Sequence, residues 1–287
     1  MEKLLKGKAA ADALDAEIMN RLPALYEKNI VPTIAIVRVG EKPDDIAYEN
    51  GAVKKAKKVG VQPEKYTCPA DIEQEDLIAV IQSINENEKI HGILLLQPLP
   101  KGIDARAVKN SIAPEKDLDC VSDASLAGFF TGSGVGYPPC TAESCMEILK
   151  FYEIPVWGKK AVVIGRSMVI GKPVAMMLLA ENATVTTCHT KTDKDDLISY
   201  CRNADIVIAA AGHAGTFTSE MAAPGQTVID VGINFDDEGH MFGDVDFDEV
   251  SPLVQAITPV PGGVGSMTTT LLMRHLVDAA EKAAGIE

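Results

Sequence analysis

The chain has 287 residues, of which 46% are hydrophobic, with one Trp and seven Phe. This length allows two domains or one large domain, and the composition is sufficient for a sizeable aliphatic core. The formal net charge of −14 argues against a nucleic-acid-binding surface, which leaves a small-molecule enzyme as the default class.

Three absences suggest where the protein works. No apolar run approaches the roughly 20 residues of a membrane span, and the N-terminal residues lack the apolar stretch of a secretory signal. The six cysteines include no C-x-x-C pair, so we expect reduced thiols and no metal site. We therefore expect a cytoplasmic protein without membrane or nucleic-acid partners.

The first half of the chain alternates between helical and strand patterns. Hydrophobic spacing predicts helices over 8–29, 44–60 and 71–87, and strands over 32–40, 61–68 and 89–96. We expect Asp44 and Asp45 to cap the second of these helices. This alternation predicts a first α/β domain.

A loop-rich segment follows, and we place a domain boundary near Cys140. Beyond a connecting helix over 141–152, strands are predicted at 161–164, 183–188, 204–210, 226–231 and 256–260. Their order is typical of a doubly wound, Rossmann-like parallel sheet. The last helix, over 267–284, is expected to return to the first domain. The predicted domains are therefore 1–140 plus 267–287, and 141–266.

A possible phosphate site begins at the first strand of the second domain. Ala161 to Ile164 is apolar, Gly165 follows at once, and Gly171-Lys-Pro173 opens a helix. A glycine turn before a helix N-terminus forms an anion site, because free N–H groups and the positive end of the helix dipole face one point. The spacing differs from G-x-G-x-x-G, and an ordinary βα loop is the alternative for this motif taken alone.

The end of the next strand indicates which nucleotide binds. Ala183 to Cys188 is followed by His189-Thr190-Lys191-Thr192, with no carboxylate before Asp193. Sites for NAD usually place an acid there for the ribose hydroxyls. Arg166 and Thr190, together with Lys191, suit a 2′-phosphate instead, so NADP is the expected cofactor, with NAD as the alternative.

Four further stretches carry chemistry-bearing residues: Tyr48, Asp117-Leu-Asp119, Cys140-Thr141 and Pro259 to Gly265. Each alone is equally compatible with a packing residue, a surface carboxylate or an ordinary turn. A ligand cleft between the two domains would collect them, because domain interfaces are favoured binding places.

Taken together, these motifs resemble one family. The stretches Gly165-Arg-Ser with Gly171-Lys-Pro, Pro114 to Asp119, Pro139-Cys-Thr141 and Thr258 to Gly265 are similar to those of the bifunctional methylenetetrahydrofolate dehydrogenase/methenyltetrahydrofolate cyclohydrolases. The resemblance runs from about residue 8 to 284. It implies a homodimer of two-domain subunits, in which the N-terminal domain with the last helix holds folate and the middle domain holds NADP.

The resemblance also implies roles for individual residues. Asp119 would bind the pterin and Tyr48 would stack along the folate. The other implied folate contacts are Gln97, Pro261, Gly262 and Gly263, and the implied nucleotide contacts are Gly165, Arg166, Ser167, Gly171, His189 and Thr190.

The chain departs from the family at the cyclohydrolase residues. The family lysine four residues after the tyrosine is Ala52 here, and the family glutamine aligns with Leu96, beside Gln97. Lys54 lies about 120° off the face of Tyr48, and Lys55 lies about 10 Å further along the helix. We therefore expect a dehydrogenase with weak or absent cyclohydrolase activity.

Three alternatives remain at this stage. One is a fully bifunctional enzyme that uses Lys55 or Lys54 in place of the missing lysine. Another is a folate- or nucleotide-binding protein without turnover. A third, a different two-domain dehydrogenase such as one acting on shikimate, is disfavoured by the run from Thr258 to Gly265.

Overall fold

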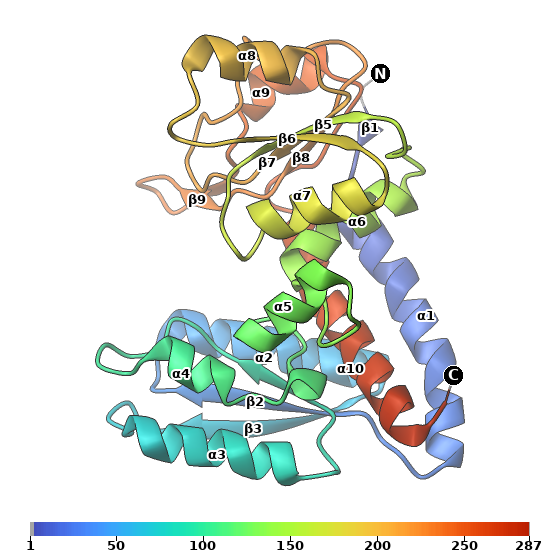
Figure 1. The fold of residues 1–287 in the computed structure, drawn as a ribbon, viewed down its shortest axis with the longest axis vertical. Coiled ribbons are helices and arrows are strands. Elements are labelled where there is room, and N and C mark those ends of the chain that lie inside the picture. Colours follow the sequence, from blue (N-terminus) through green and yellow to red (C-terminus); the bar gives the residue numbers. More distant parts are fainter. Residues whose placement is uncertain (1–2, 287) are drawn as a thin grey trace. The chain divides into compact units, whose positions relative to one another are not determined.

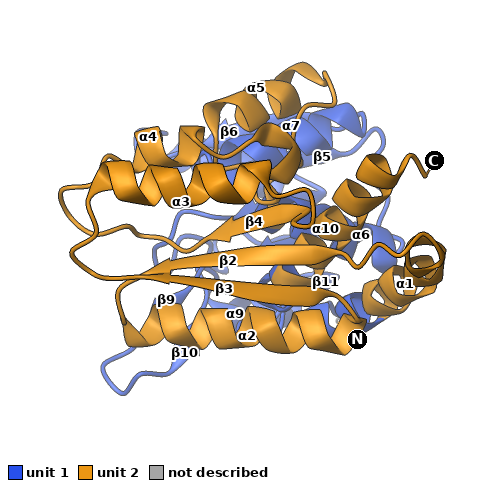
Figure 2. Cartoon of the chain, turned by 90° about the horizontal axis from the view of Figure 1, so that it is seen from below, with its two compact units in different colours: residues 1–12, 141–268 blue, residues 13–140, 269–287 orange. Residues whose placement is uncertain are grey.

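The computed structural model describes residues 3–286, which form two compact units. Unit 1 comprises residues 1–12 and 141–268, and unit 2 comprises 13–140 and 269–287 (Figure 2). The boundaries fall inside α1 (Gly7–Glu27) and next to the first residues of α6 (Cys140–Phe151) and α10 (Thr268–Ala284). No helix within 3–286 is long and apolar enough to cross a membrane.

Residues 3–12 group with unit 1, whereas the expected division placed them in the N-terminal domain. The reason is strand pairing. β1 (Lys3–Leu4) lies parallel to β11 (Ala256–Ile257), and the backbone N–H of Gly7 donates to the carbonyl oxygen of Gly262 at 2.9 Å. β1 is therefore an edge strand of the unit 1 sheet.

Unit 2 contains a parallel three-stranded sheet in the order β3 (Gln62–Cys68), β2 (Thr33–Val39), β4 (Gly92–Leu95). α2 (Pro43–Val59) and α3 (Gln74–Glu86) cover opposite faces of this sheet (Figures 1 and 2). Every residue of β2 is buried, as expected for the central strand of a covered parallel sheet. The expected alternation of helices and strands in this half is confirmed.

One cap in unit 2 differs from the expectation. α2 begins at Pro43 with Lys42 as its N-cap, so Asp44 and Asp45 lie in the first turn and do not cap the helix. Proline at the first helical position has no N–H to satisfy, which explains why the helix starts there.

Two short helices that the sequence did not predict lie beside the expected loop stretches 113–119 and 128–139, and the second overlaps the latter at 128–131. α4 (Ala105–Asn110) begins at Asp104, whose carboxylate accepts from the N–H of Arg106 at 2.9 Å. α5 (Asp123–Thr131) begins at Ser122, whose hydroxyl accepts from the N–H of Ser125 at 3.2 Å. Between them lies the 3₁₀ turn η1 (Pro114–Lys116), directly before Asp117 to Asp119.

Unit 1 contains a parallel six-stranded sheet in the order β1-β11-β8-β7-β5-β6. Its inner strands are β11, β8 (Thr227–Asp230), β7 (Ile206–Ala209) and β5 (Lys160–Ile164), and β6 (Thr184–Cys188) forms the edge opposite β1. The five predicted strands and the doubly wound order are confirmed. β9 (Asn234–Phe235) and β10 (Met241–Phe242) add an antiparallel pair that the sequence did not indicate.

Helices cover both faces of the unit 1 sheet. α6 and α7 (Gly171–Ala180) lie on one face, and α8 (Lys194–Arg202) and α9 (Phe247–Val250) on the other (Figure 1). The chain runs from β5 to β6 on one side and then returns to β7 on the other side of β5. The strand order therefore reverses between β5 and β7, and open α/β sheets bind ligands at the carboxyl end of such a point.

Candidate active site

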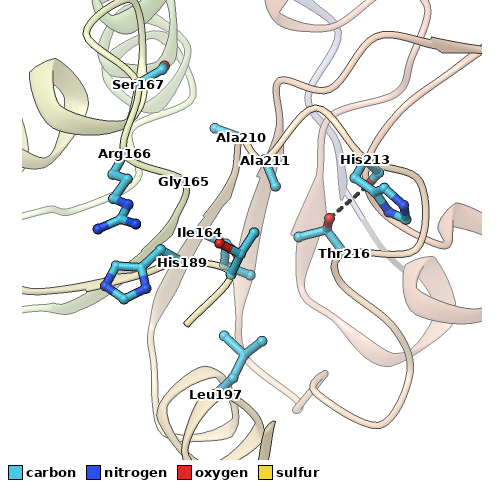
Figure 3. Close-up of a pocket in the computed structure, with 11 residues that line it drawn as sticks. Ile164, Gly165, Arg166, Ser167, His189, Leu197, Ala210, Ala211, His213 and Thr216 are labelled. Atoms are coloured by element: carbon cyan, nitrogen blue, oxygen red, sulfur yellow. Dashed lines mark hydrogen bonds between the residues drawn. The ribbon is translucent and has the colours of Figure 1, made fainter. Parts of the chain in front are cut away.

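A cavity of about 570 Å³ opens at this reversal point in unit 1 (Figure 3). It lies at the carboxyl ends of β5, β6 and β7, where three loops meet. The lining residues are Ile164, Gly165, Arg166, Ser167, His189, Thr190, Leu197, Ala210, Ala211, His213 and Thr216. The structure thus gathers five of the six predicted nucleotide residues around one space.

The sixth, Gly171, supports the cavity without lining it. A Cβ at Gly171 would lie 2.3 Å from the carbonyl oxygen of Gly165, and a Cβ at Gly165 would lie 2.1 Å from that of Ala210. Gly165 also has φ of +136°, which side chains rarely adopt. Both glycines are therefore required for the close approach of β5, β7 and the start of α7.

The loop between β5 and α7 is closed by Ser167. Its hydroxyl accepts from the N–H of Ile170 at 3.2 Å, and its carbonyl accepts from the N–H of Lys172 at 3.0 Å. Arg166 is exposed, and in Figure 3 its guanidinium points toward the imidazole of His189. The helix N-terminus and this arginine together favour a phosphate group.

The loop after β6 contains no free acid for a ribose. The N–H of Lys191 donates to Nδ1 of His189 at 3.2 Å, and the N–H of His189 donates to Thr192 Oγ1 at 3.0 Å. Asp193, the first carboxylate after the strand, caps α8 by accepting from the N–H of Asp195 at 2.9 Å. Among the described residues, none that lines the cavity is acidic, so its electrostatics favour an additional phosphate over a ribose diol.

Sequence reasoning missed the third side of the cavity. Ala210, Ala211, His213 and Thr216 follow β7, and the hydroxyl of Thr216 donates to the carbonyl of His213 at 2.6 Å (Figure 3). The sequence could have indicated these residues, because the strand predicted at 204–210 ends at the same edge of the sheet as the other two loops. Asp244 fixes the loop by accepting from the N–H groups of Ala211 and Gly212 at 2.7 and 2.8 Å.

Unit 2 places Asp119 and Tyr48 within electrostatic reach of each other. Burial raises the pKa of Tyr48, and the charges of Asp119 and Cys140 raise it further. Burial also raises the pKa of Asp119, against the hydrogen bond that its Oδ1 accepts from the Cys140 N–H at 3.0 Å. Tyr48 keeps 43% of its surface exposed and Asp119 is half-buried, so both residues can still contact a ligand.

The two positions at which we expect the chain to depart from the family are buried and apolar. Ala52 on α2 is 0% exposed and Leu96 at the end of β4 is 6% exposed. The N–H of Leu96 donates to the carbonyl of Val37 at 3.0 Å, which continues the ladder of β4 on β2. Gln97 is exposed immediately after it. Neither departed position offers an amine or an amide.

The neighbouring lysines are placed differently. Lys54 is exposed, and the Lys55 ammonium lies 2.9 Å from both carboxylate oxygens of Asp15. Lys42, which sequence reasoning did not consider, donates from Nζ to the carbonyl of Pro98 at 3.1 Å. Lys42 therefore contacts the loop carrying Gln97.

The turn from Pro259 to Gly265 belongs to unit 1. Pro261 and Gly262 are exposed, while a Cβ at Gly263 would lie 2.5 Å from the Pro259 carbonyl oxygen. Thr258 is buried, and its Oγ1 accepts from the N–H of Asp230 at 2.7 Å. The buried residue Thr258 thus anchors the start of the turn, and the backbone at Pro261 and Gly262 is exposed to solvent.

A doubly wound sheet with a cavity at its reversal point defines a dinucleotide-binding α/β protein. Two family models match the chain. The tetrahydrofolate dehydrogenase/cyclohydrolase catalytic domain matches residues 5–119, and the NAD(P)-binding domain of the same family matches residues 139–284. The chain therefore belongs to the tetrahydrofolate dehydrogenase/cyclohydrolase family.

Individual relatives are similar over the whole length. The bifunctional protein FolD of Carboxydothermus hydrogenoformans is 48% identical over 288 residues, which cover 100% of both chains. The crystal structure of the bifunctional enzyme FolD from Campylobacter jejuni has a TM-score of 0.94 at 39% identity, covering 98% of this chain and 99% of that one. The Trypanosoma brucei enzyme, complexed with NADP cofactor and inhibitor, has a TM-score of 0.91 at 32% identity, covering 99% and 98%.

Proposed function

We propose that the protein is an NADP-dependent dehydrogenase that oxidises 5,10-methylenetetrahydrofolate to 5,10-methenyltetrahydrofolate. The observation that carries the proposal is the unit 1 cavity, which combines a helix N-terminus, Arg166 and the absence of lining acids among the described residues. Family membership supplies the folate substrate, and the related Trypanosoma brucei structure holds NADP.

Residues of the two units take separate tasks in this proposal. In unit 1 the Gly165 to Ser167 loop and the start of α7 bind the phosphates, and Arg166 with Thr190 binds the 2′-phosphate. His189 borders the same space. In unit 2, Asp119 accepts hydrogen bonds from the amino-pyrimidine edge of the pterin, and Tyr48 stacks along it. Gln97, Pro261, Gly262 and Gly263 are proposed as further folate contacts.

The chemistry assigned to the protein is mostly positioning. NADP accepts a hydride, and the nitrogen lone pairs of the folate stabilise the cation that develops at the reacting carbon. The hydride half-reaction needs no protein base. The residues above therefore act by orienting the two ligands and by excluding water from them.

We further propose that cyclohydrolase activity is weak or absent. Hydrolysis requires a group that activates water, and general acid–base catalysis of this kind contributes about 10²–10⁴-fold. Ala52 and Leu96 provide no such group, and Lys55 is engaged by Asp15. Hydride transfer does not depend on these positions.

The alternative is a fully bifunctional enzyme. The relatives from Carboxydothermus hydrogenoformans and Campylobacter jejuni are both named bifunctional, which favours it. A different amine would then have to activate water, and the candidates are Lys54, Lys55 and Lys42. Lys42 is the one that contacts the loop after β4.

A single kinetic comparison tests the proposal. Purified protein is given methylenetetrahydrofolate with NADP or NAD, and nicotinamide absorbance is followed. The proposal predicts reduction of NADP with a higher kcat/KM than that of NAD. Absence of reduction with either nucleotide would instead support a binding protein without turnover.

We also propose a homodimer in the cytoplasm, by analogy with the family. All six cysteines are buried free thiols, which is compatible with a reducing compartment. Light scattering of the purified protein tests the dimer directly, since a monomeric mass at working concentration contradicts it.

A further inference from the structure

The side chains of Lys116 and Asp117 anchor the loop that carries Asp119. The carboxylate of Asp117 accepts from the N–H groups of Val121 at 3.0 Å and Ser122 at 2.8 Å. Lys116 Nζ donates to three carbonyls at the end of α3, at 2.7 to 3.0 Å. These bonds hold the two ends of the loop, but none of them reaches the peptide directly before Asp119.

That peptide is held by a residue far away in the sequence. His275 on α10 is 1% exposed, and its Nδ1 lies 2.8 Å from the carbonyl oxygen of Leu118. A carbonyl oxygen can only accept, so Nδ1 carries the proton and donates. The imidazole also stacks on Tyr137, with ring centroids 5.1 Å apart and planes at 26°. The ring orientation is therefore fixed by two contacts.

Cys140 links the same histidine to the carboxylate itself. Its Sγ lies 3.7 Å from His275 Nδ1 and donates to the Leu118 carbonyl at 3.5 Å, while its backbone N–H donates to Asp119 Oδ1 at 3.0 Å. Leu118, Asp119, Cys140 and His275 are thus connected by these contacts and are here termed the His275 cluster. All four residues lie in unit 2.

We propose that His275 is a positioning residue for folate, which fixes the carboxylate of Asp119 through the Leu118 carbonyl and Cys140. The inference rests on the proposed role of Asp119 as the pterin ligand. A carboxylate that must meet two donors of a planar ring loses binding energy when its backbone can rotate. The His275 cluster removes that freedom before the substrate arrives.

Electrostatics support the same role. Burial raises the pKa of Asp119, whereas the hydrogen bonds from Cys140 and the charge of the nearby His275 lower it. His275 therefore both orients the carboxylate and favours its ionised form, which is the form that can accept hydrogen bonds with both oxygens. An apolar residue of similar size could fill the same space in α10 but could supply neither effect.

The test uses amide variants of the full-length protein that differ in where the amide N–H sits. In His275→Asn the side-chain nitrogen takes approximately the place of Nδ1 and can still reach Leu118. In His275→Gln it takes the place of Nε2, so the donor to Leu118 is lost while polarity is kept. His275→Leu removes the donor entirely. The readouts are KM for methylenetetrahydrofolate, KM for NADP, kcat and the thermal midpoint.

The proposal expects His275→Gln and His275→Leu to raise the folate KM about tenfold, the effect of one lost hydrogen bond, with the NADP KM within about twofold. His275→Asn is expected to keep the folate KM near that of the unchanged protein. Equal increases in both KM values, or an Asn variant no better than Gln at the same thermal midpoint, would overturn it.

The outcome also separates this inference from the proposed function. If the unchanged protein does not oxidise methylenetetrahydrofolate, the proposed function fails. If the unchanged protein is active and substitution of His275 leaves the folate KM unaltered, only the positioning role fails. Should His275→Leu not fold, the comparison of Asn with Gln still decides the matter.

Discussion

The ammonium group of Lys55 lies 2.9 Å from both carboxylate oxygens of Asp15, a residue of α1 that is only 1% exposed. Lys58 contacts the same carboxylate at 2.7 Å. A buried carboxylate that loses a partner cation is costly, because its charge is then poorly compensated. Lys55 therefore joins α2 to α1 and is a poor candidate for the missing cyclohydrolase lysine.

Replacing Lys55 should affect stability more than catalysis. Lys55→Met keeps the side-chain stem and leaves Lys58 on Asp15, so we expect a loss of about 1 kcal/mol in unfolding free energy. Oxidation and hydrolysis rates should stay within about twofold, and denaturant unfolding with both assays checks this. Lys54→Met, at an exposed position, is the control. A selective fall in hydrolysis for Lys55→Met would identify Lys55 as the catalytic amine.

Restoring both family residues should create hydrolysis. The double variant Ala52→Lys, Leu96→Gln supplies an amine one helical turn from Tyr48 and an amide beside it. We expect hydrolysis of methenyltetrahydrofolate to rise at least tenfold while oxidation persists. Both sites are buried, so a loss of about 1–3 kcal/mol is expected, and the thermal midpoint should be measured in parallel. A folded, oxidising double variant with unchanged hydrolysis would argue against this assignment.

Arg166 should determine the choice between NADP and NAD. Charge-assisted bonds to a phosphate contribute about 1.5–3 kcal/mol, so Arg166→Ala is expected to raise the NADP KM about 10–100-fold and to leave the NAD KM nearly unchanged. Lys194→Ala, which removes an exposed cation on α8 outside the cavity lining, is the matched control. Parallel loss with both nucleotides would mean that Arg166 contacts a phosphate common to both.

The pH dependence of folate use should report Asp119. Burial raises the pKa of this carboxyl, and only its ionised form can accept hydrogen bonds from the pterin with both oxygens. As pH falls, kcat/KM for methylenetetrahydrofolate should therefore drop at a higher pH than an ordinary aspartate would give. Asp119→Asn should lower kcat/KM and abolish this acid limb. An identical limb in the variant would assign it to another group.

The sequence predicted the regular elements well, because long runs with clear periods specify them. It missed α4 and α5, each under three turns long, since their starts depend on the side-chain caps Asp104 and Ser122. It also missed the pairing of β1 with β11, because two-residue strands carry no readable period. These omissions changed the grouping of residues 1–12 but not the fold class.

The candidate site was predictable where it follows local motifs. The glycine turn, Arg166 and the end of β6 are contiguous signals, and the structure gathers them around one cavity. Contacts between distant segments carry no such signal. The pair of His275 with Leu118 spans 157 positions, and the pair of Lys55 with Asp15 joins two helices. Only tertiary structure could reveal that one lysine is engaged and one histidine supports Asp119.

The central claim is that this family member oxidises methylenetetrahydrofolate but hydrolyses methenyltetrahydrofolate slowly, because it has no group that activates water for the attack. The most direct measurement follows loss of methenyltetrahydrofolate without nucleotide, beside NADP reduction with methylenetetrahydrofolate, on the same preparation. Because general acid–base groups contribute about 10²–10⁴-fold, we predict hydrolysis at least about 100-fold slower than hydride transfer. Hydrolysis at a rate comparable to oxidation would contradict the claim and establish a bifunctional enzyme with an unrecognised amine.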